Sequence, residues 1–432
     1  MLTSDQNRKI NEIVEEFKEA ADFYRMEYSE DLMGMFRDFG CMLLLKCKVD
    51  TEGKADLERL LEGRHKLKGT VKRQLMTVSE ELAQLWAPGE QDGSGDTGEY
   101  EGSQNVREMF QTALEEIFHF CLYSKGGKNR YLLPEETAKP LLRLLTFPEG
   151  MMAGNEGLVV LDTQCGAGSA LMAASRYLKN PRLMGYEKDE EMWAAAVIMS
   201  QLSGLEMELH LEDGARADLY ESCDLVISNP VYGTDTIKDE ELIDQLPGEL
   251  KTVRGRYHME LIRSMQALNF DGKAMLIVPN SFLFANRTES MKVRKWLLQS
   301  YSLEAIISLP EDTFMYSGVR SSVMVFSKPF MSGGWEGHTQ RVLYYNLEKQ
   351  EDKEKQQKEY ERLEEVWSQR DSYYGKWERS RREKTVENRN GIKVPANWQY
   401  NSFWFADVDQ IERENGTFCR KITDRKSRSI WK

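Results

Sequence analysis

The period of the apolar residues changes near residue 157, and this change organises the whole chain. Upstream of it, apolar residues recur about every three or four positions, which is typical of amphipathic helices. The first helical stripe comprises Ile10, Ile13, Val14, Phe17, Ala21 and Tyr24. Similar stripes at 57–61, 78–85 and 110–121 extend the pattern, so we expect an N-terminal all-α domain.

Downstream of residue 157, short apolar runs alternate with helical stretches. The runs of strand length are 158–161, 183–187, 207–211, 225–228, 274–278, 305–309 and 323–327. This alternation predicts an α/β domain with a mixed, mostly parallel seven-stranded sheet and helices on both faces. The last two runs are separated by too little chain for a crossover helix. We therefore expect them to form an antiparallel pair at one edge of the sheet.

Composition shifts predict where the domains end. We expect an N-terminal helical domain, an α/β domain and a C-terminal helical extension at residues 1–125, 126–346 and 347–432. Residues 87–104 are rich in glycine and acids and nearly lack apolar side chains, which predicts a flexible linker within the first domain.

The C-terminal extension contains two different patterns. Residues 348–386 are dominated by charged side chains, with a narrow apolar stripe at Tyr360, Leu363 and Trp367. This pattern predicts a long exposed helix that docks on a partner or on the N-terminal helices. The aromatic residues at 398–405 are too dense for a free tail, so we expect them to pack on another part of the protein.

Composition and charge exclude several classes of protein. The 432 residues carry a net charge of −13, which argues against a protein that wraps nucleic acid by itself. No apolar run approaches the ~20 residues of a membrane span, and the polar N-terminus has no signal core, so we predict a cytoplasmic protein without membrane contact. The six cysteines are scattered without a CxxC pair, so neither a disulfide framework nor a metal site is expected.

A glycine-bearing turn follows the first strand of the α/β region. In the segment 158–168, an apolar run leads into Asp162, Gln164, Cys165, Gly166 and Gly168. The two glycines lack a Cβ atom, so a ligand can approach the backbone closely. A helix is predicted to begin near residue 169, and its N-terminal amides would face that ligand. We interpret the turn as a nucleoside-cofactor site, in which Cys165 is better explained as a small packing residue than as a nucleophile.

Acidic residues at the next two strand ends support this interpretation. Glu187 follows Gly168 by about the 20 residues at which a ribose-binding acid is usual in nucleotide-binding units of this class. Asp213 follows the next strand and is placed to bind an adenine amine. Each acid alone could be a solvated strand end or a plain turn, and the joint spacing favours a cofactor. The turn lacks the third glycine of an NAD site, and no GxxxxGK[ST] motif supports ATP.

A second motif follows the fourth strand, where residues 228–233 read Ser-Asn-Pro-Val-Tyr-Gly. The side-chain oxygen of Asn229 and the carbonyl of Pro230 can accept hydrogen bonds from an amino group, and Tyr232 can stack on the ring that carries it. An ordinary Asn-Pro turn is the competing explanation. In open α/β sheets, ligands bind at the carboxyl ends of strands, where this motif and the cofactor residues all lie. Together these features indicate methyl transfer to an amine, for which a metal is not needed.

In order and spacing, these motifs resemble those of the S-adenosylmethionine-dependent amino-methyltransferases. Within that group, the chain looks most like the modification subunit of type I restriction systems, over roughly residues 105–345. The resemblance implies a Rossmann-like methyltransferase fold, S-adenosylmethionine as the cofactor, and N6-methylation of a flipped adenine in double-stranded DNA by Asn229, Pro230 and Tyr232. It also places Tyr131 and Pro134 at the cofactor. A separate specificity subunit and a possible restriction subunit are the implied partners.

The chain departs from the family pattern at two positions. Val231 stands where the family has a second proline, and Leu133 stands where it has a threonine. Two alternatives therefore stay open. One is an amino-methyltransferase that acts on RNA or on protein glutamine, and the other is a catalytically silent, methyltransferase-like assembly subunit.

Overall fold

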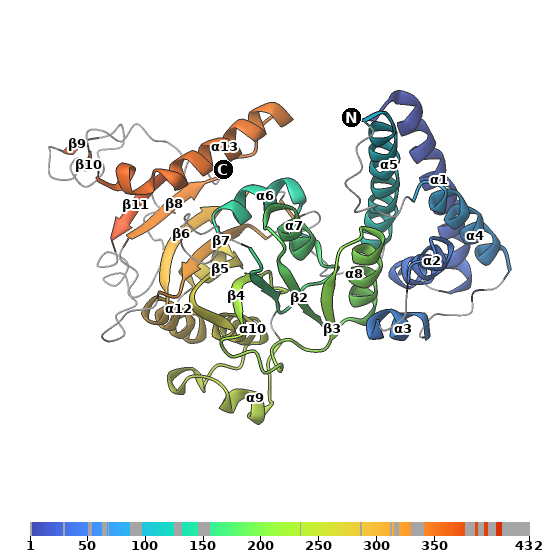
Figure 1. Ribbon diagram of the computed structural model, residues 1–432. Coiled ribbons are helices and arrows are strands. Elements are labelled where there is room, and N and C mark those ends of the chain that lie inside the picture. Colours follow the sequence, from blue (N-terminus) through green and yellow to red (C-terminus); the bar gives the residue numbers. More distant parts are fainter. Residues whose placement is uncertain are drawn as a thin grey trace. The chain divides into compact units, whose positions relative to one another are not determined.

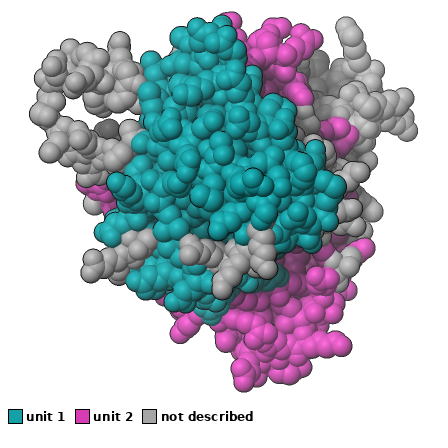
Figure 2. Space-filling view, turned by 90° about the vertical axis from the view of Figure 1, so that its right-hand side faces the viewer, with its two compact units in different colours: residues 1–130, 165–172, 185–212 teal, residues 131–164, 173–184, 213–432 magenta. Residues whose placement is uncertain are grey.

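The structure is a computed structural model (Figure 1). It describes residues 2–28, 31–50, 54–62, 67, 69–86, 97–124, 132–145, 156–233, 235–285, 287–311, 313–314, 319–329, 341–375, 385–387, 393–395 and 403–407. Its internal contacts define two compact units (Figure 2). Unit 1 comprises Met1–Arg130, Cys165–Met172 and Gly185–Glu212, and unit 2 comprises Tyr131–Gln164, Ala173–Met184 and Asp213–Lys432. The domain limits expected from composition remain predictions.

The N-terminal part of unit 1 is helical, as its apolar periodicity predicts. The helices are α1 (Ser4–Glu27), α2 (Met33–Lys46), α3 (Ala55–Glu62), α4 (Gly69–Ala83) and α5 (Thr97–Leu122). Helix α1 begins with a capping box, in which Thr3 and Gln6 satisfy each other's backbone N–H groups. Its predicted stripe is buried against α4 and α5, and α2 packs on α4, α5 and α8.

The predicted linker at 87–104 is shorter than expected. Helix α5 begins at Thr97, so residues 97–104 have helical backbone, whereas residues 87–96 lie outside the described residues. Glycine is unfavourable in a helix by only about 1 kcal/mol per residue, which a long helix can absorb through packing further along its length. Phe110, Ile117 and Leu122 of α5 are buried.

All seven predicted strands are present. They are β1 (Val159–Asp162), β2 (Arg182–Glu187), β3 (Met207–Leu211), β4 (Cys223–Ser228), β5 (Leu268–Pro279), β6 (Ser302–Ser308) and β7 (Ser321–Ser327). The helices of this region are α6 (Glu135–Arg143), α7 (Ser169–Tyr177), α8 (Glu190–Leu202), α9 (Glu240–Asp244), α10 (Arg256–Gln266), α11 (Asn280–Phe284) and α12 (Thr288–Ser300), with a short 3-10 helix η2 (Gly248–Leu250). Within unit 2, α10 and α12 cover one face of the sheet (Figure 1).

The sheet has nine strands rather than the predicted seven. Their order is β11-β8-β6-β7-β5-β4-β1-β2-β3, with β8 (Arg341–Asn346) and β11 (Phe403–Asp407) added beyond β6. Strands β6 and β7 pair in antiparallel fashion, as predicted, but they do not form the edge. Strand β8 runs parallel to β6, and β11 pairs with β8 in antiparallel fashion. The additional pairing satisfies backbone groups that an edge strand would leave exposed.

The C-terminal extension is anchored in unit 2. Helix α13 (Lys353–Ser368) buries Tyr360, Leu363, Val366 and Trp367 and packs on α6. The predicted charged helix with its narrow apolar stripe is present, but it covers Lys353–Ser368 rather than 348–386, and the surface it packs on is α6, which the sequence did not indicate. Of the predicted aromatic segment, residues 403–405 lie in β11, which pairs with β8, so this part contacts the fold as expected; residues 398–402 lie outside the described residues. A two-stranded ribbon of β9 (Thr385–Glu387) and β10 (Lys393–Pro395) lies between these elements in the chain.

Strands β1 and β4 are parallel neighbours, and their register decides where the two motifs lie. Val160 is opposite Leu225, and Leu161 is opposite Val226. The carboxyl ends of both strands therefore lie at the same edge of the sheet, so the turn after β1 and the motif after β4 begin side by side. Among the described residues, none of the helices combines the length and the apolar character that crossing a bilayer requires.

Candidate functional site

One group of predicted site residues lies in unit 2, where the turn after β1 begins. Asp162 is 2% exposed, and its Oδ1 accepts a hydrogen bond of 3.0 Å from the backbone N–H of Gln164. This contact bends the chain immediately after the strand. Ser228 donates to the Gln164 side-chain oxygen over 3.2 Å, which joins the turn directly to the end of β4.

Asn229 follows at the end of β4, and its amide is available to a ligand. The residue is half-buried, whereas Pro230 is buried. Within the described part of the chain, the Asn229 side chain makes no hydrogen bond. A half-buried amide without a protein partner is costly unless water or a ligand completes it. Val231, which stands where the family has its second proline, is 46% exposed.

Tyr232 presents an aromatic ring next to the Asn-Pro pair. Its hydroxyl lies 3.3 Å from the Ser321 hydroxyl at the start of β7. Its ring meets Tyr257 edge to face, with centroids 5.6 Å apart and planes at 75°. Burial raises the pKa of Tyr257 far above its usual value, so this neighbour remains a neutral phenol that supports the Tyr232 ring.

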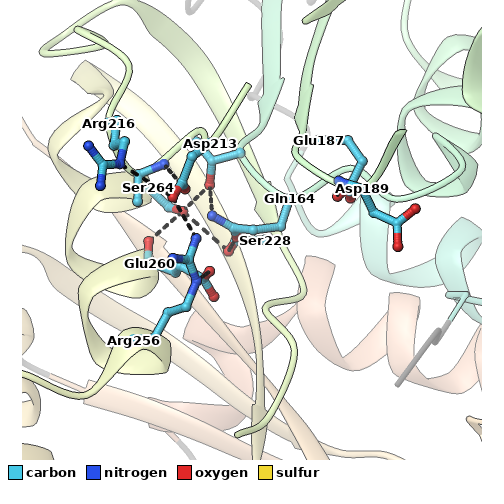
Figure 3. Close-up of polar contacts among 11 residues, drawn as sticks. Gln164, Glu187, Asp189, Asp213, Arg216, Ser228, Arg256, Glu260 and Ser264 are labelled. Atoms are coloured by element: carbon cyan, nitrogen blue, oxygen red, sulfur yellow. Dashed lines mark hydrogen bonds and ion pairs between the residues drawn. The ribbon is translucent and has the colours of Figure 1, made fainter. Parts of the chain in front are cut away.

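Asp213 is held by two arginines, which sequence reasoning did not anticipate (Figure 3). Its Oδ2 lies 2.7 Å from Arg256 and 3.8 Å from Arg216. Arg256 also donates to Glu260 over 2.8 Å, and Arg216 pairs with Asp239 at 2.6 Å. The hydrogen bonds to Asp213 and Glu260 outweigh the effect of burial and raise the pKa of Arg256. A ligand amine that binds Asp213 would therefore join an existing charge network.

Another group of predicted site residues lies in unit 1. The backbone N–H of Gly166 donates to Oε2 of Glu187 over 3.0 Å, and the N–H of Cys165 donates to the carbonyl of Tyr186 over 2.9 Å. These two bonds bind the glycine turn to the end of β2. Cys165 is 6% exposed, which supports its interpretation as a packing residue.

Both predicted glycines adopt conformations that other residues disfavour. Their φ angles are +56° at Gly166 and +78° at Gly168. A Cβ atom built on Gly168 would lie 2.9 Å from Met207, whereas one on Gly166 would meet only Met192, at 3.6 Å. Gly168 therefore serves close packing as well as backbone shape, whereas at Gly166 packing leaves room for a ligand.

Glu187 has a carboxyl group with a raised pKa. Burial raises the pKa of its carboxyl, although N–H groups from Asp189 and Gly166 partly offset this effect. The Asp189 N–H reaches Oε1 over 2.7 Å. A carboxylate that is mostly desolvated and bears two hydrogen bonds is a strong acceptor for the hydroxyls of a ligand.

Two further residues, Tyr131 and Pro134, were predicted to lie at the cofactor. Tyr131 lies outside the described residues. Pro134 is the N-cap of α6 and follows Leu133, which is 3% exposed. Sequence reasoning also missed Gly185 in β2, where an added Cβ would lie 2.9 Å from the Cys165 sulfur. A glycine inside a strand is the signal that could have revealed this close approach.

The fold and the paired strand-end motifs define a class of protein, the Rossmann-like methyltransferases. The model of the N-6 DNA Methylase family matches residues 107–407, which is well over half of the sequence. The chain therefore belongs to the N-6 DNA methylase family. This membership confirms the family resemblance and the predicted fold class, with the correction in strand number given above.

Relatives of this chain carry names from restriction-modification systems. The type II restriction enzyme and methyltransferase RM.BcgI of Heyndrickxia coagulans is 26% identical over 213 residues, which are 45% of this chain and 31% of that protein. The type I restriction enzyme MjaVII methylase subunit of Methanocaldococcus jannaschii is 24% identical over 298 residues, 63% of this chain and 47% of that protein. The chain thus spans less than half of the length of either relative.

A solved structure shows the same fold. The methyltransferase subunit of a type I restriction-modification system from Streptococcus thermophilus superposes with a TM-score of 0.58 at 15% identity. The match covers 95% of this chain and 98% of that chain.

Proposed function

We propose that this protein is a DNA adenine-N6 methyltransferase that uses S-adenosylmethionine and acts as the modification subunit of a type I-like restriction-modification system. The observation that carries the proposal is the β1–β4 register, which begins the Asp162 turn and the Asn229 motif side by side in unit 2. Methyl transfer needs a donor site and an acceptor site that lie next to each other. Family membership supports the choice of DNA as the substrate.

The residue types suit the chemistry of an exocyclic amine. The lone pair of such a nitrogen is delocalised into the ring, so the amine is a poor nucleophile. The Asn229 oxygen and the Pro230 carbonyl accept its two N–H bonds and favour a more tetrahedral nitrogen. That nitrogen forms the new N–C bond, the electrons of the broken S–C bond stay on sulfur, and the proton is lost to water. Tyr232 stacks on the base once the base has left the duplex.

The residues in the structure fit the cofactor. When bound, S-adenosylmethionine supplies an activated sulfonium methyl group, so positioning supplies most of the rate. Gly166 leaves space against the backbone, Glu187 offers a carboxylate to ribose hydroxyls, and Asp213 offers one to the adenine amine. Asp162 shapes the turn by accepting a hydrogen bond from the backbone N–H of Gln164.

The charge of the chain explains why a partner is part of the proposal. At −13, the chain lacks the overall positive charge that duplex binding draws on, because phosphate contacts require Lys and Arg. A specificity subunit that brings the DNA would remove this difficulty. The names of the two curated relatives are consistent with such an assembly.

A methylation assay tests the proposal. The protein, alone and with a specificity subunit encoded beside its gene, is incubated with labelled S-adenosylmethionine and unmethylated duplex DNA. The product is then digested to nucleosides. We expect label in N6-methyladenine, and we expect Asn229→Ala to abolish it. Asn269→Ala is the matched control, since Asn269 lies at the opposite end of the neighbouring strand and bonds only Asp224, over 3.2 Å, within the described residues.

Each alternative predicts a different result in the same assay. Label in RNA or in protein glutamine, with none in DNA, would identify the other amino-methyltransferase classes. A folded protein that shows no S-adenosylmethionine binding by calorimetry would identify a silent assembly subunit.

A further inference from the structure

Four side chains, including that of Ser228 just before Asn229, form a closed ring of hydrogen bonds (Figure 3). Gln164 Nε2 donates to the Thr163 hydroxyl over 2.7 Å, and that hydroxyl lies 2.5 Å from the Ser264 hydroxyl. Ser264 donates to the Ser228 hydroxyl over 3.3 Å. Ser228 donates to Gln164 Oε1 over 3.2 Å and closes the ring.

Donor counting shows that the ring is self-consistent. Each hydroxyl has one hydrogen, and Gln164 offers both a donor and an acceptor. When every member donates in the same sense, from Gln164 through Thr163, Ser264 and Ser228, all four contacts are made, with the single Ser264 hydrogen shared between the Ser228 hydroxyl, at 3.3 Å, and the Glu260 carbonyl, at 2.8 Å. Such a chain of bonds is mutually polarised in a low-dielectric site, and it fixes which way the Gln164 amide points.

The ring is buried. Ser228 and Ser264 are fully buried, and Thr163 is 1% exposed. Breaking one contact would therefore leave a buried polar group without its partner, which costs more than the bond itself contributes.

The ring joins three elements at the place where the direct pairing of β1 with β4 ends. Residues Thr163 and Gln164 lie just past the end of β1, Ser228 ends β4, and Ser264 lies on α10. The ladder between β1 and β4 pairs Leu161 with Val226, before either strand reaches the ring. Beyond that point, side chains must fix the separation of the two strand ends. Ser264 also donates to the carbonyl of Glu260 over 2.8 Å, which anchors it to its own helix.

We propose that Ser264 is a positioning residue for methyl transfer, acting through Thr163 and Ser228. It would hold the turn that bears Gln164 and the strand end that bears Asn229 at a constant separation. This inference rests on the proposed function. In-line transfer requires the reacting atoms to lie about 3–3.5 Å apart, and a displacement of about 1 Å can cost about 100-fold in rate. The ring holds the backbone on both sides of that gap.

The test compares variants that remove one hydroxyl each. Ser264→Ala removes the link from α10, Thr163→Val removes the neighbouring hydroxyl at nearly constant shape, and Thr163→Ser keeps that hydroxyl. Ser79→Ala is the matched control, because Ser79 is fully buried and bonds only to the carbonyl of Met76, over 2.8 Å, within the described residues. The assays are steady-state and single-turnover methylation of DNA, cofactor affinity by calorimetry, and thermal unfolding.

We expect Ser264→Ala and Thr163→Val to lower kcat and the single-turnover rate about 10-fold to 100-fold, since they loosen the reacting geometry. The KM for DNA and the Kd for S-adenosylmethionine should change less than about threefold, because no ligand contact is removed. Thr163→Ser should restore the rate to within about threefold of wild type. The double variant Ser264→Ala/Thr163→Val should lose no more rate than the slower of the two single variants, because substitutions within one hydrogen-bond network are not additive.

Several outcomes would overturn the inference. One is that wild type methylates DNA and Ser264→Ala does so at the rate of Ser79→Ala. Another is that Thr163→Ser is as slow as Thr163→Val. If Ser264→Ala does not fold, the Thr163 pair decides the matter alone. A wild-type protein that methylates no DNA would instead refute the proposed function, and this inference with it.

Discussion

The two glycines of the cofactor turn should respond differently to the same substitution. Gly166→Ala and Gly168→Ala each place a methyl group on a residue with positive φ, which costs about 1–2 kcal/mol for an L-residue. Both variants also lose backbone entropy in the unfolded chain, which returns about 0.4–1 kcal/mol to each. These contributions are common to the two sites, so packing decides the difference.

Packing differs sharply between the two positions. The new Cβ at Gly168 would lie 2.9 Å from Met207 Cε and 3.5 Å from Ala196 Cβ. Overpacking of this kind costs about 1–3 kcal/mol, and the flexible end of Met207 favours the lower part of that range. The new Cβ at Gly166 meets only Met192, at 3.6 Å, which is ordinary contact. We therefore expect Gly168→Ala to be less stable than Gly166→Ala by about 1 kcal/mol or more.

Cofactor affinity should follow the opposite order. Beside Gly166 the added methyl group would touch only Met192, at an ordinary contact distance, so we expect it to clash with the ligand rather than with the fold. Urea unfolding of both variants measures the stability difference, and calorimetry with S-adenosylmethionine measures the affinity. Equal stability of the two variants would refute the packing argument. Undiminished affinity in Gly166→Ala would refute the assignment of the space beside Gly166 to the cofactor.

Three further predictions follow from individual side chains. Because burial raises the pKa of Glu187, its carboxyl gains a proton at a higher pH than an ordinary glutamate does, so S-adenosylmethionine affinity should fall as pH drops from 8 to about 5. The same raised pKa also affects stability, because the contribution of Glu187 is present at low pH and is lost as pH rises through that pKa. In Glu187→Gln, calorimetry across the same pH range should show an affinity for S-adenosylmethionine that does not change with pH. Tyr232→Phe keeps the ring and removes the hydroxyl that contacts Ser321, so kcat/KM should stay within about threefold, whereas Tyr232→Ala should lower it at least about fivefold, because base stacking is worth about 1–3 kcal/mol. Arg294 is fully buried and donates to the carbonyls of Phe282 and Ala285 over 2.6 and 2.9 Å, so Arg294→Met should cost about 2–5 kcal/mol in urea unfolding, and an unchanged midpoint would contradict this.

The ion pairs on Asp213 place the predicted cofactor residue in a wider setting. Arg256 lies at the start of α10, the same helix that carries Ser264 near its end. One end of helix α10 thus contacts the carboxylate that is predicted to bind adenine, and the other end contributes Ser264 to the hydrogen-bond ring.

Local patterns alone determined the seven central strands, the helical N-terminal part and the positions of the two motifs. This was possible because apolar periodicity, glycine and Asn-Pro each act on neighbouring residues. Tertiary structure decided what lies beyond that range. It set β8 and β11 outside β6, and it extended α5 back to Thr97 through a glycine-rich segment. It also closed the ring through Ser264, which is 101 residues from Thr163 and 36 from Ser228. The local sequence around a serine does not reveal which group its hydroxyl will bond, because that partner is set only when packing brings distant segments together.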